Sequence, residues 1–176
     1  MSLLKLPTQE NATGEVKEIF LEVEALFSMV PNGLRLWSAN PKALRLQWNH
    51  IKEVMSKDED TQKLHALIRY LVSNKNGCEY CIGLNKGMLI NFYAMKEEQI
   101  NEIESDLNRA PLNEKNKALL SFAMKSVRNP ESVNSEDLAQ LKLLNISEIE
   151  MFDIAHAAAH MLVINTLFET FNVEAD

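Results

Sequence analysis

Residues 67–83 read Leu-Ile-Arg-Tyr-Leu-Val-Ser-Asn-Lys-Asn-Gly-Cys-Glu-Tyr-Cys-Ile-Gly and join an apolar segment to two cysteines at C-x-x-C spacing. The apolar residues before the cysteines recur at the three- and four-residue intervals of one helix face: Leu64, Leu67, Ile68, Leu71 and Val72. Gly77 can take the positive φ that ends many helices. We therefore predict a helix over about residues 60–74 and a second one that begins at the cysteines and runs to about residue 92.

The same spacing recurs along nearly the whole chain, which has only 5 Gly and 5 Pro among 176 residues. Two helix starts are marked locally. Asn40 precedes Pro41, as a cap precedes a first-turn proline, and Ser147-Glu-Ile-Glu150 fits a capping box. The remaining helices are predicted at about residues 16–30, 34–37, 41–55, 96–107, 111–128, 135–144 and 147–171. The sequence thus predicts an all-α protein of about eight to nine helices, with residues 1–176 as a single domain.

The charge balance excludes several partner classes. The chain has 18 basic and 25 acidic residues, a net charge of −7, and no local cluster of Lys and Arg. Such a surface repels nucleic acid and anionic membranes, so neither is expected as a partner. No apolar run approaches the ~20 residues that cross a bilayer, and the first residues do not resemble a signal peptide. We expect a cytoplasmic protein.

Cys78 and Cys81 are the only cysteines in the chain. In a reducing compartment such a close pair points to redox chemistry or metal binding rather than to structural crosslinking. A cysteine at a helix N-terminus is favoured as the thiolate by the backbone N–H groups and the helix dipole. A thiolate can attack a peroxide or a disulfide, after which the second thiol closes a bridge. This couple needs no cofactor and no metal.

Zinc binding and plain burial are the alternatives for the cysteines. A zinc site needs further ligands, and His156 and His160 lie one helical turn apart. However, 75 residues separate Cys81 from His156, against about 12–20 in compact zinc modules. Free cysteines are also often small buried apolar residues, but this pair directly follows a helix-cap signal. Redox chemistry is therefore the favoured interpretation.

Residues 67–73 followed by Asn76-Gly-Cys-Glu-Tyr-Cys81 resemble the core of the alkylhydroperoxidase AhpD / carboxymuconolactone decarboxylase family, in its peroxidase-related branch. The resemblance extends to segments 30–44, 111–123, 130–137 and 144–147. It implies an all-α, AhpD-like helical bundle that assembles as a homo-oligomer, a trimer or a hexamer. It also implies reduction of hydroperoxides by the cysteine pair, regenerated by a dithiol such as a lipoylated or thioredoxin-like protein.

The chain departs from this family at two positions. The family pattern has a Glu twelve residues before the first cysteine and a His four residues after the second, forming a proton relay. Here these positions hold Ala66 and Asn85, and neither side chain titrates. The resemblance implies that Cys81 attacks and Cys78 resolves, whereas the helix dipole alone favours Cys78 as the nucleophile.

Other residues are candidates to replace the relay. The Tyr80 hydroxyl can donate to a sulfur or a peroxide oxygen. His65 precedes Ala66 by one residue and so points about 100° away from it. His156 and His160 can approach from the last helix or from another subunit. Each also has a structural interpretation: ring packing for Tyr80, a surface position for His65 and a helix contact for the histidine pair. The candidate catalytic residues are Cys81, Cys78, Tyr80, Asn85 and His65.

The sequence therefore favours a thiol-dependent peroxidase or disulfide reductase that acts on hydroperoxides, with activity reduced by the missing relay. Two alternatives keep the fold. One is a weakly catalytic, oligomeric redox-sensing or binding module. The other is a carboxymuconolactone decarboxylase-type enzyme, for which the chain offers only scattered arginines (Arg35, Arg45 and Arg69) to hold a substrate carboxylate.

Overall fold

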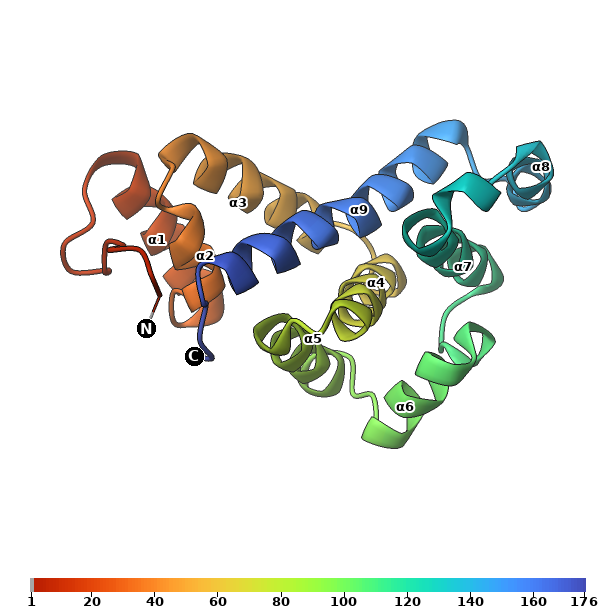
Figure 1. Ribbon diagram of the computed structural model, residues 1–176, viewed down its shortest axis with the longest axis horizontal. Coiled ribbons are helices and arrows are strands. Elements are labelled where there is room, and N and C mark those ends of the chain that lie inside the picture. The colour runs from red at the N-terminus through yellow and green to blue at the C-terminus, as the bar shows by residue number, and fades with distance from the viewer. Residues whose placement is uncertain (1) are drawn as a thin grey trace. The chain divides into compact units, whose positions relative to one another are not determined.

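The predicted helices are all present in the computed structural model, which describes residues 2–176 (Figure 1). Within these residues the chain forms nine α-helices, two short 3₁₀ turns and no strand, so the all-α prediction is confirmed. The chain divides into two units: residues up to Lys57 together with Thr166–Asp176, and Asp58–Asn165. That residues 1–176 behave as a single domain stays a prediction.

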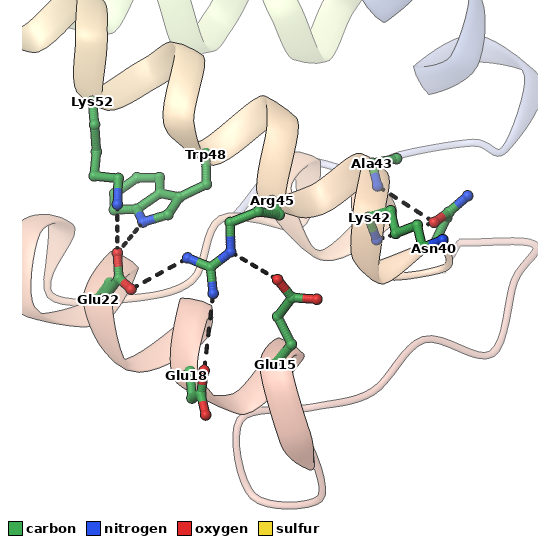
Figure 2. Close-up of polar contacts among 9 residues, drawn as sticks. All are labelled: Glu15, Glu18, Glu22, Asn40, Lys42, Ala43, Arg45, Trp48 and Lys52. Carbon is green, nitrogen blue, oxygen red and sulfur yellow. Dashed lines mark hydrogen bonds and ion pairs between the residues drawn. The ribbon is translucent and has the colours of Figure 1, made fainter.

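The first unit contains α1 (Gly14–Phe27), α2 (Asn32–Trp37) and α3 (Pro41–Met55). Its core consists of apolar side chains from all three helices and the segments beside them: Ala12, Val16, Ile19, Phe20, Val23, Val30, Leu34, Leu44 and Trp48. The Asn40 side chain accepts hydrogen bonds from the backbone N–H groups of Lys42 and Ala43, and Pro41 is the first residue of α3 (Figure 2). The predicted cap of α3 is thereby confirmed.

A polar cluster around Glu22 joins α1 to α3 at the edge of this core (Figure 2). The Glu22 carboxylate accepts from Trp48 Nε1 at 2.6 Å and from Lys52 Nζ at 2.8 Å. Arg45 contacts Glu22 at 3.4 Å and Glu15 at 2.9 Å. The hydrogen bonds from Lys52 and Trp48 lower the pKa of Glu22 from 4.5 to about 2.

The second unit is built around α4 (Glu59–Asn76), which contacts both α5 (Glu79–Asn91) and α7 (Glu114–Arg128). Asp58 caps the start of α4, and Gly77 ends it with φ +74°. The unit also contains α6 (Glu97–Ser105), α8 (Ser135–Leu143) and α9 (Glu148–Thr170) as far as Asn165, with 3₁₀ turns at Leu107–Arg109 and Pro130–Ser132. Its most deeply buried side chains include Leu64, Leu67, Ile68, Ile100, Ile103, Leu120 and Met124.

Helix α9 begins at the predicted capping box. Glu150 accepts from the Ser147 backbone N–H at 2.9 Å, and Ser147 Oγ accepts from the Glu150 N–H at 3.2 Å. Within the described residues, α9 alone is long and apolar enough to cross a membrane, with 44% of its most hydrophobic window buried. From the sequence we expected no such segment. The finding is a weak indication of a span, because the core helix of a soluble protein passes the same test.

Candidate functional site

The two cysteines lie in the first turn of α5, where the sequence placed them. Gly77 and Cys78 both donate their backbone N–H to the Ser73 carbonyl, at 2.9 and 3.2 Å, and this ends α4. Cys78 is then the N-cap of α5 and Cys81 its third residue. The backbone N–H groups of a first helical turn have no partner within the helix. Both sulfur-bearing residues therefore lie where the helix favours negative charge.

Both cysteines are thiols and both are closed to solvent, with 0% of Cys78 and 1% of Cys81 exposed. Tyr80, which lies between them, is buried as well. Two hollows of this unit lie elsewhere. One is lined by Leu71, Asn74, Lys75, Glu104 and Arg128, and the other shares Lys75 and Arg128. A molecule that reacts with either thiol must therefore be small, or the first turn of α5 must open to admit it.

Asn85, at the position where the family that the sequence resembles has a His, lies inside the unit and ties α5 to α4. Its Nδ2 donates to the Cys81 carbonyl oxygen at 2.8 Å, and its Oδ1 accepts from Arg69 Nε at 2.9 Å. Ala66, at the family's Glu position, is fully buried on α4. Where the family pattern has a titrating Glu and His, this chain therefore has Ala66 and an Asn85 amide that is hydrogen-bonded to Arg69 and to the Cys81 carbonyl.

Arg69 is the residue that the sequence analysis missed, since it appeared there only among scattered arginines. It is half-buried, and its Nη2 approaches Met88 Sδ at 4.0 Å. No carboxylate of residues 2–176 lies within ion-pair distance of it, and burial lowers the pKa of its guanidinium. The spacing of residues could have indicated Arg69 from the sequence, because Arg69 follows Ala66 by three residues and so lies on the same face of α4.

The structure also places the histidine candidates. His65 is half-buried on α4 beside Ala66. The rings of His156 and His160 stack on each other with centroids 5.8 Å apart, and His156 also stacks on Phe152 at 6.1 Å. In residues 2–176 there is no group of three or more His, Cys, Asp or Glu that could hold a metal ion. The roles of Cys81, Cys78, Tyr80, Asn85 and His65 stay predictions.

Two crystal structures match this arrangement over nearly the whole chain. An uncharacterised peroxidase-related protein from Ralstonia eutropha JMP134, described as an alkylhydroperoxidase AhpD core, covers 99% of this chain and 92% of its own, at 22% identity and TM-score 0.80. A peroxidase-related protein from Silicibacter sp. TM1040 covers the same shares at 20% identity and TM-score 0.80.

This chain has the AhpD-like fold. A further structure with this fold is the debrominase Bmp8, a variant of which was solved in complex with 2,3,4-tribromopyrrole; it is 18% identical, covers 100% of this chain and 94% of its own, and has TM-score 0.73. No protein-family model matches the sequence, and no curated protein matches it. The chain therefore has the AhpD-like fold although its sequence identity to these three solved structures is only 18–22%.

Proposed function

We propose that the protein is a thiol-dependent peroxidase or disulfide reductase that acts on hydroperoxides through Cys81 and Cys78. The observation that carries this proposal is the placement of both thiols in the first turn of α5. The Asn85 amide connects this turn to the half-buried Arg69 guanidinium, which has no carboxylate partner. The AhpD-like fold supports it, since two solved examples are described as peroxidase-related.

The proposed cycle balances with a dithiol as the reductant. The Cys81 thiolate attacks one peroxide oxygen, the O–O bond breaks, and the alcohol or water leaves with a proton, which converts Cys81 to a sulfenic acid. The Cys78 thiol then attacks the sulfenic sulfur, an S–S bond forms and water leaves. A dithiol of the lipoylated or thioredoxin-like class reduces the disulfide and is itself oxidised.

Arg69 takes the place of the missing relay in this proposal. A half-buried cation with no carboxylate beside it favours an anion near it. The Asn85 amide connects Arg69 to the backbone of Cys81, so the positive charge is held beside the turn that bears the thiols. A fixed charge stabilises a thiolate but transfers no proton. We therefore expect a lower rate than a relay gives, since general acid–base catalysis contributes roughly 10²–10⁴-fold.

The first experiment measures hydroperoxide consumption with a dithiol reductant. Cys81→Ser should abolish turnover, because it removes the attacking thiolate. Cys78→Ser should retain one oxidation event per chain and accumulate a sulfenic acid that a dimedone probe captures. Hydrogen peroxide should react faster than the bulkier cumene hydroperoxide because both thiols are closed to solvent. A Cys81→Ser protein that still turns over would remove the proposal.

The second experiment separates an electrostatic role of Arg69 from a purely structural one. Arg69→Met should slow thiol oxidation at neutral pH and shift the rise of the rate to higher pH, since the thiolate loses its cation. Arg69→Lys keeps the charge and should retain the position of that rise. Identical pH profiles for all three proteins would show that Arg69 only holds the helices together.

The Bmp8 likeness favours reductive dehalogenation as a second candidate. The thiolate would attack the bromine of a bromopyrrole, the ring carbon would take a proton, and the second thiol would displace bromide as the disulfide forms. Bromide release from 2,3,4-tribromopyrrole, lost in Cys81→Ser, supports this activity in place of the peroxidase. If the protein turns over none of these oxidants, the interpretation that remains is the weakly catalytic redox-sensing or binding module.

A further inference from the structure

A hollow of about 390 Å³ lies beside the C-terminal ends of α4, α6 and α7, all within the second unit. Its lining is mostly polar: Leu71, Asn74 and Lys75 from α4, Glu104 from α6 and Arg128 from α7. Sites for small molecules usually measure about 300–1,000 Å³, so this hollow has room for a small ligand. The fold thus gathers two cations and one carboxylate around the same space.

Within residues 2–176 the two cations of this hollow have no counter-ion. No carboxylate of that part of the chain lies within ion-pair distance of Lys75 or Arg128, although Glu104 lines the same hollow. Each cation is in the last turn of its helix, where it offsets the partial negative charge of the free carbonyl groups. That placement accounts for a cation at each helix end, but not for two cations around one hollow. Two such cations can hold the carboxylate of a ligand.

The Glu104 carboxylate is fixed by a different partner. It accepts a hydrogen bond from the Tyr70 hydroxyl, and Tyr70 is only 3% exposed. Burial, and then the hydrogen bond to Glu104, raise the pKa of Tyr70, so the phenol stays protonated and continues to donate. The hollow therefore keeps a negative charge on α6 apart from the two positive charges on α4 and α7.

We propose that this hollow binds a free α-amino acid as its zwitterion. The carboxylate of the ligand lies between Lys75 and Arg128, and its ammonium group donates to Glu104. Three helices end here, and their last carbonyl groups add partial negative charge. That charge favours the ammonium group of the ligand and disfavours a dianion such as phosphate.

The second hollow indicates the size of the ligand's side chain. It shares Lys75 and Arg128 with the first hollow, and apart from Asn76 the rest of its lining is apolar: Val72, Met124, Val127 and Leu162. Its volume is about 30 Å³, close to the ~30 Å³ that one water occupies in the liquid. A methyl group fits this space, so L-alanine is the probe.

Equilibrium dialysis with radiolabelled L-alanine tests the site. We expect saturable binding of one L-alanine per chain. Arg128→Leu should raise the dissociation constant about tenfold or more, because the carboxylate loses a charged hydrogen-bond donor. Arg109→Leu removes an exposed cation of the same unit that lines neither hollow, and it should leave the dissociation constant unchanged. No saturable binding up to about 20 mM L-alanine, or equal effects of the two substitutions, overturns the proposal.

Acetate and inorganic phosphate distinguish a zwitterion site from an anion site. Glu104→Gln keeps an oxygen that accepts from Tyr70 but removes the charge. It should weaken L-alanine binding, because the ammonium group loses its counter-ion, and strengthen acetate binding, because the repulsion is gone. Glu98→Gln, at an exposed position of the same helix, should change neither. Acetate or phosphate that binds the unaltered chain more tightly than L-alanine does overturns the proposal.

A last variant separates this site from the proposed redox function. Neither cysteine lines either hollow. Cys81→Ser, which should abolish turnover, is therefore expected to bind L-alanine with the same dissociation constant as the unaltered chain. Loss of L-alanine binding in Cys81→Ser would overturn the assignment of the ligand to the hollow between Lys75, Glu104 and Arg128.

Discussion

Asn85 shows how a single residue changes what the site can do. A histidine at this position would titrate, whereas the amide only accepts from Arg69 and donates to the Cys81 carbonyl. The cysteine motif and its departures were readable from sequence because they are local. The Arg69–Asn85 bond was not, because it joins residues 16 positions apart on two helices and depends on how α4 and α5 pack.

Removing this bridge has a measurable cost. We expect Asn85→Leu to lower the free energy of unfolding by about 1–3 kcal/mol, since it leaves the half-buried Arg69 guanidinium without its acceptor and removes the bond to the Cys81 carbonyl. Denaturant unfolding followed by circular dichroism gives the value. Asn91→Leu, at the exposed end of the same helix, is the matched control and should change the free energy by less than about 0.5 kcal/mol. Equal effects of the two substitutions would contradict the bridging role.

The ends of helices follow from local chemistry, and this is why the elements were predicted well. The Asn40 cap, the positive φ of Gly77 and the Ser147–Glu150 box each involve neighbours within a few residues. What a helix packs against is a different matter. Helix α9 was predicted as a long final helix, but its apolar residues occupy both faces. The sequence alone does not say which of the two faces is buried.

The contact between α1 and α3 makes a pH-dependent contribution to the free energy of unfolding through the Glu22 carboxylate. Its pKa is about 2 in the folded chain, against 4.5 without partners. The stabilisation is therefore complete above pH 4.5 and is lost as the pH falls through 2. The side chain is 42% exposed, so solvent screening reduces the contribution to the order of 1 kcal/mol.

Comparison of two variants isolates this term. Glu22→Gln should be less stable than the unaltered chain by about 1 kcal/mol at pH 7, and the difference should vanish near pH 2. Glu24→Gln, a neighbouring exposed position, should show no such convergence. Thermal unfolding across this pH range measures both. A difference between Glu22→Gln and the unaltered chain that persists at pH 2 would contradict the assignment to Lys52 and Trp48.

At the scale of the whole molecule, the sequence predicts one domain and the structure divides into two units. The distribution of two residue types makes the prediction testable without altering the chain. Both tryptophans, Trp37 and Trp48, belong to the first unit, and both cysteines belong to the second. Trp48 is buried in its unit and the thiols are buried in theirs. Each unit therefore has its own reporter of unfolding.

We expect the two reporters to change together. If residues 1–176 unfold as one domain, the midpoint of tryptophan fluorescence in urea should coincide with the midpoint at which Cys78 and Cys81 become reactive to a short pulse of an alkylating reagent. Fluorescence of the Cys78→Ser, Cys81→Ser double variant controls for any effect of the thiols on the first unit. Midpoints that differ by more than about 0.3 M urea would show two domains that unfold separately. The midpoint is the free energy of unfolding in water divided by the slope of that free energy against urea concentration, so two midpoints report two separate transitions. In that case the thiol site would belong to a domain that is stable without the tryptophan-bearing helices.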